Sequence, residues 1–153
     1  MKNIILVRHG KDEKNSLTQL GRNQIQQMAI YLKTDLKLSG KIHLICSPLK
    51  RAMQSAEIIA NSLGLKMYPD ELFDDNLEYS SDLQKAVADI LEIGSDFDHV
   101  IVVTHQPATM GLPIYLLKTC FPDNPENPYV PPTINGKANI FDCETGEIHF
   151  NLP

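Results

Sequence analysis

The chain has 153 residues, of which 42% are hydrophobic and 22% charged, and its formal net charge is −5. This composition is typical of a globular protein, and the length suits one domain spanning residues 1–153. The negative net charge argues against a nucleic-acid partner or a polybasic contact with a membrane. It does not exclude an anionic substrate, because a local cluster of arginines can override the net sign.

The cysteines and the N-terminus indicate a compartment. Three widely spaced cysteines without a CxxC pair are typical of reduced thiols. The apolar run at residues 4–7 is too short for a signal peptide, and no stretch approaches the length of a membrane span. We therefore expect a cytoplasmic protein with no membrane partner, and the sequence leaves its oligomeric state open.

The first half of the chain alternates short branched apolar runs, typical of buried strands, with segments of helical spacing. Strands are expected at 4–7, 42–46 and 65–68, and helices at 18–33 and from 47 to about 63. Ser47 and Pro48 are typical of an N-cap followed by a proline in the first helical turn, so they are expected to open the second helix. An acidic loop follows at 70–75.

The second half continues the same alternation. We expect a helix at 82–93, a central strand at 100–103, a helix at 107–119 and a hairpin of strands at 138–142 and 147–150. Five prolines predict an irregular segment at 121–132, whose role the sequence leaves open. The pattern predicts an α/β fold, a three-layer α/β/α sandwich around a largely parallel sheet. Ligands of such sheets bind at the carboxyl ends of the strands.

Polar side chains follow three of the predicted strands. Arg8 and His9 end the first strand, and Ser47 follows the second, with Arg51 one helical turn further on. His105 comes after the later central strand. Because the ends of parallel strands meet at one edge of a sheet, two histidines and two arginines would form an anion pocket there. One of the histidines would be a candidate nucleophile.

Each of these residues has an ordinary structural explanation when taken alone. A single histidine after a strand is usually a solvated or capping residue, and Arg51 would usually be a surface charge on its helix. An Arg-His-Gly tripeptide arises by chance in about one chain of this length per hundred. The order of several such motifs along one chain favours a functional site.

That order resembles the histidine phosphatase superfamily, also called the phosphoglycerate-mutase-like group. The residues that carry the resemblance are Arg8-His9-Gly10, the Leu-Thr-x-x-Gly-x-x-Gln pattern at 17–24, SPLKRAMQSA at 47–56, and Thr104-His105. The compact length is similar to that of the short bacterial phosphohistidine phosphatases in this group. The resemblance implies a phosphoglycerate-mutase-like fold without a large lid.

The resemblance also implies a metal-independent phosphatase mechanism. His9 would attack phosphorus and become phosphohistidine, which water then hydrolyses. A backbone carbonyl at Gly10 would suit the other ring nitrogen, because a hydrogen bond there selects the tautomer. Arg8 and Arg51 would bind the phosphoryl oxygens as bidentate donors, and a protonated His105 would add a further donor. No metal and no cofactor is expected.

Four further residues are assigned by the resemblance. Gly10, Thr18 and Ser47 are expected near the phosphate, although Thr18 and Ser47 fit helix capping equally well. Asp74 is the best match to the general acid of the family. The other carboxylates that remain possible are Glu71, Asp75 and Glu78.

The substrate is predicted from what the chain lacks between Asp74 and His105. One helix and its connections account for this stretch, so no large lid fits, and an open, shallow pocket favours phosphate on a protein side chain. A weak acid motif is compatible with phosphohistidine, because protonated imidazole is a good leaving group. The leading hypothesis is a protein phosphohistidine phosphatase. A phosphomonoesterase for small phosphate esters and a non-catalytic phosphate-binding module remain alternatives.

Overall fold

The computed structural model describes residues 1–153, and a six-stranded mixed sheet lies at the centre of the molecule. Its spatial order is β5-β4-β6-β1-β7-β8. The strands are β1 (Asn3–Arg8), β4 (Ile42–Cys46), β5 (Met67–Pro69), β6 (His99–Thr104), β7 (Ala138–Asp142) and β8 (Ile148–Leu152). The first four are parallel to one another, and β7 and β8 are antiparallel additions at one edge. The predicted largely parallel sheet is confirmed.

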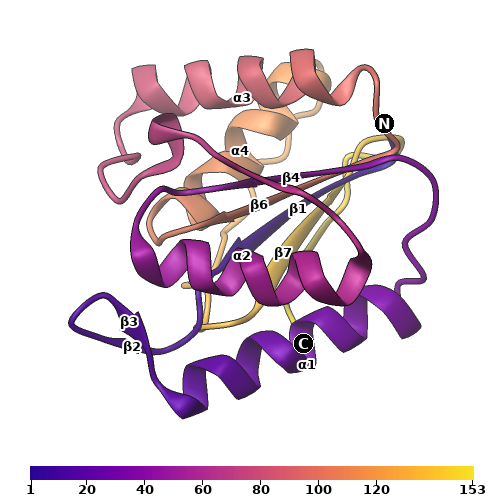
Figure 1. The fold of residues 1–153 in the computed structure, drawn as a ribbon. Coiled ribbons are helices and arrows are strands. Elements are labelled where there is room, and N and C mark those ends of the chain that lie inside the picture. Colours follow the sequence, from indigo (N-terminus) through magenta and orange to yellow (C-terminus); the bar gives the residue numbers. More distant parts are fainter.

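Four α-helices cover the sheet, two on each face, as Figure 1 shows. The pairs are α1 (Gln19–Thr34) with α2 (Lys50–Leu63), and α3 (Ser80–Gly94) with α4 (Ala108–Cys120). Smaller elements are the ribbon of β2 (Asp12–Glu13) and β3 (Ser16–Leu17) and the 3-10 helix η1 (Glu71–Phe73). The arrangement confirms the predicted three-layer sandwich. None of the helices combines the length and apolarity needed to cross a membrane.

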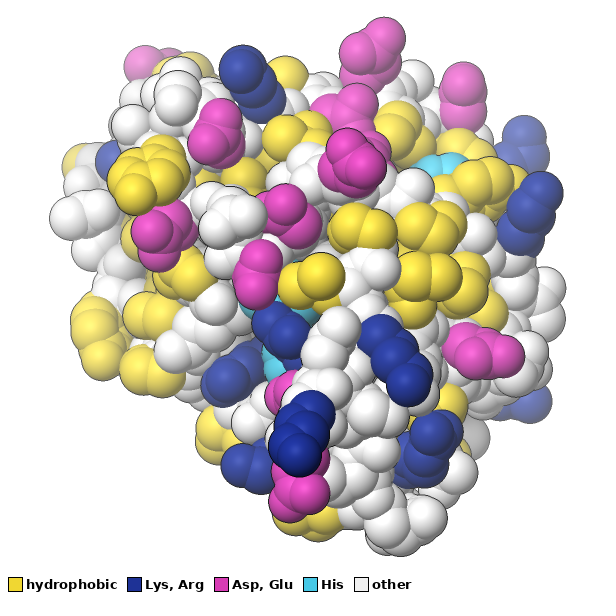
Figure 2. Space-filling model, turned by 60° about the vertical axis from the view of Figure 1, so that its left-hand side comes forward, with side chains coloured by type: hydrophobic (Ala, Val, Ile, Leu, Met, Phe, Trp, Pro, Cys, Tyr) yellow, Lys and Arg dark blue, Asp and Glu magenta, His cyan; other side chains and the backbone are white.

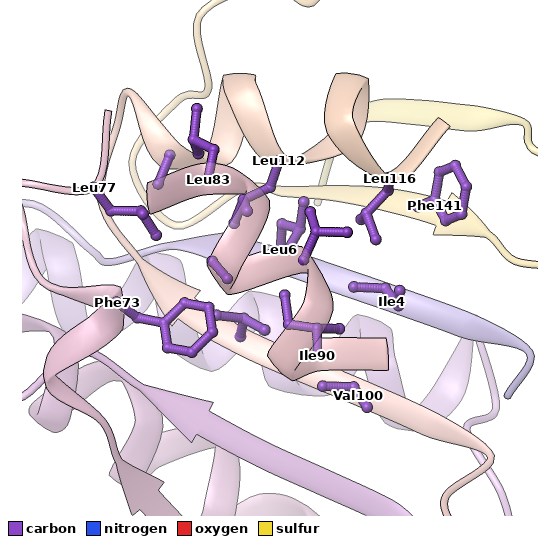
Figure 3. Packing of buried hydrophobic residues seen from close by; sticks show 14 of the residues in the cluster. Ile4, Leu6, Phe73, Leu77, Leu83, Ile90, Val100, Leu112, Leu116 and Phe141 are labelled. Atoms are coloured by element: carbon purple, nitrogen blue, oxygen red, sulfur yellow. The ribbon is translucent and has the colours of Figure 1, made fainter. Parts of the chain in front are cut away.

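The continuous apolar runs are explained by burial on both faces of the sheet. In β1, Ile4 and Leu6 belong to the core under α3 and α4, whereas Ile5 and Val7 belong to the core under α1 and α2. Figure 3 shows the first of these cores, where Phe73 also packs. Burying such a side chain completely stabilises the fold by about 1.5–3 kcal/mol. Alternate residues thus supply both cores, and no polar position interrupts the strand.

The start of α2 differs from the prediction. The helix begins at Lys50 with Leu49 as N-cap, so Ser47 and Pro48 do not cap and open it. The Ser47 hydroxyl instead bonds the Leu49 amide and the ring of His105. The hydroxyl is therefore engaged one turn before the helix starts, and this expectation was wrong.

Candidate active site

The ends of three parallel strands bring the predicted site residues together. Arg8 at the end of β1 is in register with Thr104 at the end of β6. The His9 amide donates to the Thr104 carbonyl oxygen at 3.2 Å. The ring centroids of His9 and His105 are 5.0 Å apart, and Ser47 follows the end of β4 beside them. The sheet therefore presents both histidines at one edge.

His9 is held as one tautomer by the backbone. Its Nδ1 lies 2.8 Å from the Gly10 carbonyl oxygen. A carbonyl can only accept, so Nδ1 carries the proton and Nε2 keeps its lone pair. Arg51 Nε donates to that Nε2 at 3.2 Å. Burial lowers the pKa of His9, with the charge of Arg51 adding to the effect, so the ring is neutral at neutral pH. A neutral imidazole is a competent nucleophile once Arg51 turns from its Nε2 lone pair to an incoming phosphate.

Arg51 is held by a residue that the sequence patterns did not single out. Asn15 Oδ1 accepts from the Arg51 backbone amide at 3.2 Å and from Arg51 Nη1 at 3.1 Å. Asn15 thus caps α2 from outside the helix and fixes the guanidinium. It forms, with Lys14, the turn between β2 and β3, and both have positive φ. Asparagine tolerates that conformation well, so the Lys-Asn pair between Asp12-Glu13 and Ser16-Leu17 was the available signal.

Arg8 is anchored by one end of its guanidinium. Nη1 donates to the Thr133 carbonyl oxygen at 2.7 Å and to Gln106 Oε1 at 3.4 Å. Its Nε is buried and has no hydrogen-bond partner. A buried donor of this kind is costly unless an acceptor meets it, and a phosphate oxygen is such an acceptor. The geometry therefore suits Arg8 to an anion.

The environment of His105 favours the neutral ring. Burial lowers its pKa to about 4, and the neighbouring His9 and Arg51 act in the same direction. Its Nε2 lies 2.7 Å from Ser47 Oγ. The protonated form expected from the sequence requires the negative charge of a bound phosphate, which would raise the pKa of His105 again.

The carboxylates of the acidic loop occupy different positions. Asp75 lies 3.3 Å from Arg51 Nη2, while Asp74 Oδ1 accepts from the Asn76 amide at 2.8 Å. The negative charges of both raise the pKa of His105 against the effect of burial, so both lie within its electrostatic reach. Glu71 is exposed and Glu78 lines a neighbouring groove. The assignment of Asp74 as acid stays a prediction, with Asp75 as its nearest competitor.

The other predicted binding residues have structural roles here. The Thr18 hydroxyl accepts from the Gly21 amide at 3.0 Å and donates to the Lys11 carbonyl at 3.1 Å, which caps α1. Gly10 donates its amide to Ser55 Oγ at 3.1 Å. A Cβ at Gly10 would collide with the backbone of Gly21, so the close approach of the two segments requires glycine. Contact of Thr18 or Gly10 with a substrate stays a prediction.

The surroundings of the histidines are basic despite the net charge of −5. Figure 2 shows histidine surface in cyan near the middle of the face, with dark-blue Lys and Arg side chains beside it and magenta acidic side chains both above and below it. Exposed lysines on the segments that carry the site are Lys11, Lys14 and Lys50. No group of three or more His, Cys, Asp or Glu side chains is placed to hold a metal ion. The site can bind an anion, position it against a nucleophile and neutralise its charge.

A comparison with protein-family models matches the first half of the chain to a known family. Residues 4–78 match the model of the Histidine phosphatase superfamily (branch 1). This stretch contains Arg8, His9, Arg51 and the acidic loop, and it ends before His105. No curated protein sequence matches the chain.

Several solved structures are similar over nearly the whole chain at low identity. The protein histidine phosphatase SixA, complexed with tungstate, is 23% identical with a TM-score of 0.71, and the match covers 97% of this chain and 94% of SixA. The mycobacterial glucosyl-3-phosphoglycerate phosphatase Rv2419c is 15% identical with a TM-score of 0.71, covering 99% and 98%. The open reading frame Rv3214 from Mycobacterium tuberculosis is 17% identical with a TM-score of 0.68, covering 99% and 97%. These likenesses show the phosphoglycerate-mutase-like fold.

Proposed function

Since the chain belongs to branch 1 of the histidine phosphatase superfamily, we propose that it removes phosphate from phosphohistidine on a protein, through a phosphohistidine intermediate on His9. Membership makes it a hydrolase of phosphorylated substrates. The observation that carries the choice of nucleophile is the pair of bonds on His9. Gly10 holds the proton on Nδ1, and Nε2 is left with its lone pair beside Arg51.

The reaction runs in two displacements at phosphorus. The Nε2 lone pair of His9 forms a P–N bond as the P–N bond to the substrate imidazole breaks, and the departing ring nitrogen takes a proton from water or from a neighbouring carboxylic acid. Water then attacks the phosphorus on His9, releasing inorganic phosphate and restoring the neutral ring. Charge stays on the three equatorial oxygens throughout, so Arg8 and Arg51 stabilise the transferring group electrostatically.

A carboxylic acid near the phosphate could protonate the leaving group, and how much this matters depends on the substrate. Asp74, or Asp75 beside Arg51, would protonate an alkoxide, which is a poor leaving group. Imidazole leaves more readily because it accepts a proton at neutral pH. Phosphohistidine is therefore the substrate that depends least on a well-positioned acid, and neither carboxylate here is held against the histidine rings by a hydrogen bond.

The likeness to solved structures supports two substrate classes. SixA is a protein histidine phosphatase by its description, whereas Rv2419c acts on glucosyl-3-phosphoglycerate, and both have a TM-score of 0.71. A small-molecule phosphomonoesterase with the same mechanism is therefore the second candidate. The absence of a large insertion between α3 and β6 favours the protein substrate, because a small ester gains more from an enclosing lid.

The test compares hydrolysis of a phosphohistidine peptide with that of a panel of sugar phosphates, without added metal. Wild type is expected to prefer the peptide, and His9→Ala is expected to lose activity by at least about a thousandfold, because the nucleophile is gone. His149→Ala is the matched control, because this histidine lies on the exposed edge strand β8. Faster turnover of a sugar phosphate would favour the second candidate. Equal inactivity of wild type and His9→Ala on every substrate would favour a non-catalytic phosphate-binding module.

A further inference from the structure

An apolar groove of about 720 Å³ lies at the same edge of the sheet, and the phosphoryl-transfer chemistry does not use it. It is formed by the start of α3, one side of α4 and the irregular segment before β7. The side chains that shape it are Tyr79, Leu83, Met110, Ile114, Tyr129 and Val130. A phosphoryl group needs none of this surface, so the groove is available to the rest of the substrate.

The groove is continuous with the residues that hold Arg8. Pro107 lines the groove and directly follows Gln106, whose Oε1 lies 3.4 Å from Arg8 Nη1. On its other side, Val130 belongs to the segment that reaches Thr133, whose carbonyl accepts from Arg8 at 2.7 Å. A group attached to a phosphate at Arg8 therefore has the groove as its neighbouring surface.

The lining selects the chemistry of that group. Glu78 is the only charged residue in the groove, and most of the remaining surface is aromatic or aliphatic. Sugar hydroxyls would leave water for a surface with few hydrogen-bond partners, which is unfavourable. Apolar side chains have no hydrogen bonds to water to lose on entering the groove. The carboxylate of Glu78 favours a lysine or arginine close by.

The exposure of the groove favours a protein segment over a small molecule as its ligand. Tyr79 and Tyr129 are 66% and 79% exposed, so they stand above the surface on two sides of the groove. Small-molecule sites enclose most of their ligand, whereas exposed tyrosine and methionine are enriched where proteins meet. Figure 2 shows hydrophobic side chains, in yellow, on the same face as the histidines.

We propose that this groove binds apolar side chains that flank the phosphohistidine in a protein substrate, in a segment that also carries a basic residue. The inference rests on the proposed function and adds to it that the sequence around the phosphorylated histidine selects the substrate. Tyr79 and Tyr129 are then specificity residues, which act on the flanking segment and not on the phosphorus.

The test uses three substrates: free phosphohistidine, a phosphohistidine peptide with leucine, phenylalanine and lysine flanks, and the same peptide with serine in place of leucine and phenylalanine. Wild type is expected to prefer the apolar peptide by about tenfold in kcat/KM, the range that one buried apolar group supplies. The Tyr79→Ser/Tyr129→Ser double variant should lose this preference and keep its turnover of free phosphohistidine. Met110→Ser, on the α4 wall, should reduce the preference several-fold.

Ile30→Ser is the matched control, because Ile30 is a half-exposed apolar residue on α1, in the opposite helical layer. It should retain the full preference. Equal turnover of both peptides by wild type, with free phosphohistidine still hydrolysed, would overturn the proposed role of the groove and leave the proposed function standing. Equal losses on all three substrates in the double variant would also overturn it, since the tyrosines would then serve the phosphate site. Hydrolysis of p-nitrophenyl phosphate but of no phosphohistidine compound would remove both proposals.

Discussion

Asn15 shows how one side chain can organise the site without touching the phosphorus. Its Oδ1 accepts from both the backbone and the guanidinium of Arg51, 36 positions further along the chain. Leu49, the N-cap of α2, supplies no side-chain hydrogen bond of its own. The same amide oxygen therefore satisfies a helix terminus and aims a cation at His9.

We expect Asn15→Ala to lower kcat by about ten- to a hundredfold, because Arg51 would lose the acceptor that orients it, and one hydrogen bond to a charged group contributes about 1.5–3 kcal/mol. Steady-state kinetics on a phosphohistidine peptide would separate kcat from KM. Asn15→Asp keeps the acceptor oxygen and should restore part of the activity. Asn23→Ala, on the exposed face of α1, is the control. An Asn15→Ala enzyme with unchanged kcat would show that Arg51 is positioned by other contacts.

At the scale of elements, Asn139 in β7 links three segments on the side of the site where Arg8 is anchored. It is completely buried. Its Nδ2 donates to the Thr109 carbonyl in α4 at 2.9 Å and to Thr133 Oγ1 at 3.1 Å, and its Oδ1 accepts from the Asn151 amide at 3.0 Å. The Thr133 carbonyl in turn holds Arg8. A buried amide thus fixes the irregular segment to the sheet edge.

Asn139→Ala should lower the free energy of unfolding by about 1–3 kcal/mol, because buried groups lose their partners. It should also raise KM for phosphorylated substrates, since Arg8 depends on the Thr133 carbonyl. Urea unfolding and steady-state kinetics measured well below the melting temperature would check both effects. Loss of stability with KM unchanged would mean that Arg8 does not depend on this link.

Most elements were predicted to within two residues, and the strands that lead to the site are among them. The strands at 4–7, 42–46 and 100–103 are confirmed within β1, β4 and β6, because each contains a run of buried apolar residues, which is unbroken in β1 and β6 and interrupted by His43 in β4. The residues that follow them therefore converge as expected. The third strand lies at Met67–Pro69, displaced from the predicted 65–68, because an edge strand of three residues carries little pattern.

The parts that escaped prediction are those specified by tertiary contact. The β2–β3 ribbon has two residues in each strand, which is too short for any periodicity, so Asn15 went unnoticed. The acidic loop offered four carboxylates in a polar stretch with no spacing rule, and only the fold separates Asp75 at Arg51 from exposed Glu71. The apolar groove is lined by three segments that are distant in the sequence, so no local motif predicts it.

At the scale of the whole molecule, the buried histidines link folding to pH. The unfolded reference pKa of a histidine is 6.5, and burial lowers the pKa of His105 to about 4 in the folded protein. The pKa of His9 is lowered in the same direction. Between the two values the unfolded chain binds more protons than the folded one. The stability that these rings contribute is therefore present above pH 6.5 and is lost as the pH falls towards about 4.

His105→Gln should make the free energy of unfolding less dependent on pH across this window, because one of the three buried imidazoles, His9, His99 and His105, is removed. Urea unfolding of wild type and variant, measured at pH 6.5 and near pH 4, would give the two slopes. Glutamine keeps a polar group beside Ser47 Oγ, so the variant is expected to fold. Identical slopes would assign the acid lability to other groups, among them His9 and His99, whose pKa values burial also lowers.

The backbone contact on His9 also decides the regiochemistry of the intermediate. Since the Gly10 carbonyl holds the proton on Nδ1, only Nε2 has a lone pair to offer once Arg51 turns from it, and the proposed reaction would form a single positional isomer of phosphohistidine. That carbonyl is held in place where Gly10 packs on Gly21, at a distance that excludes a Cβ. Changes to the side chains of the pocket would therefore alter the rate of phosphorylation without redirecting it to the other nitrogen. The contact between Gly10 and Gly21, and not a reactive side chain, therefore determines which isomer forms.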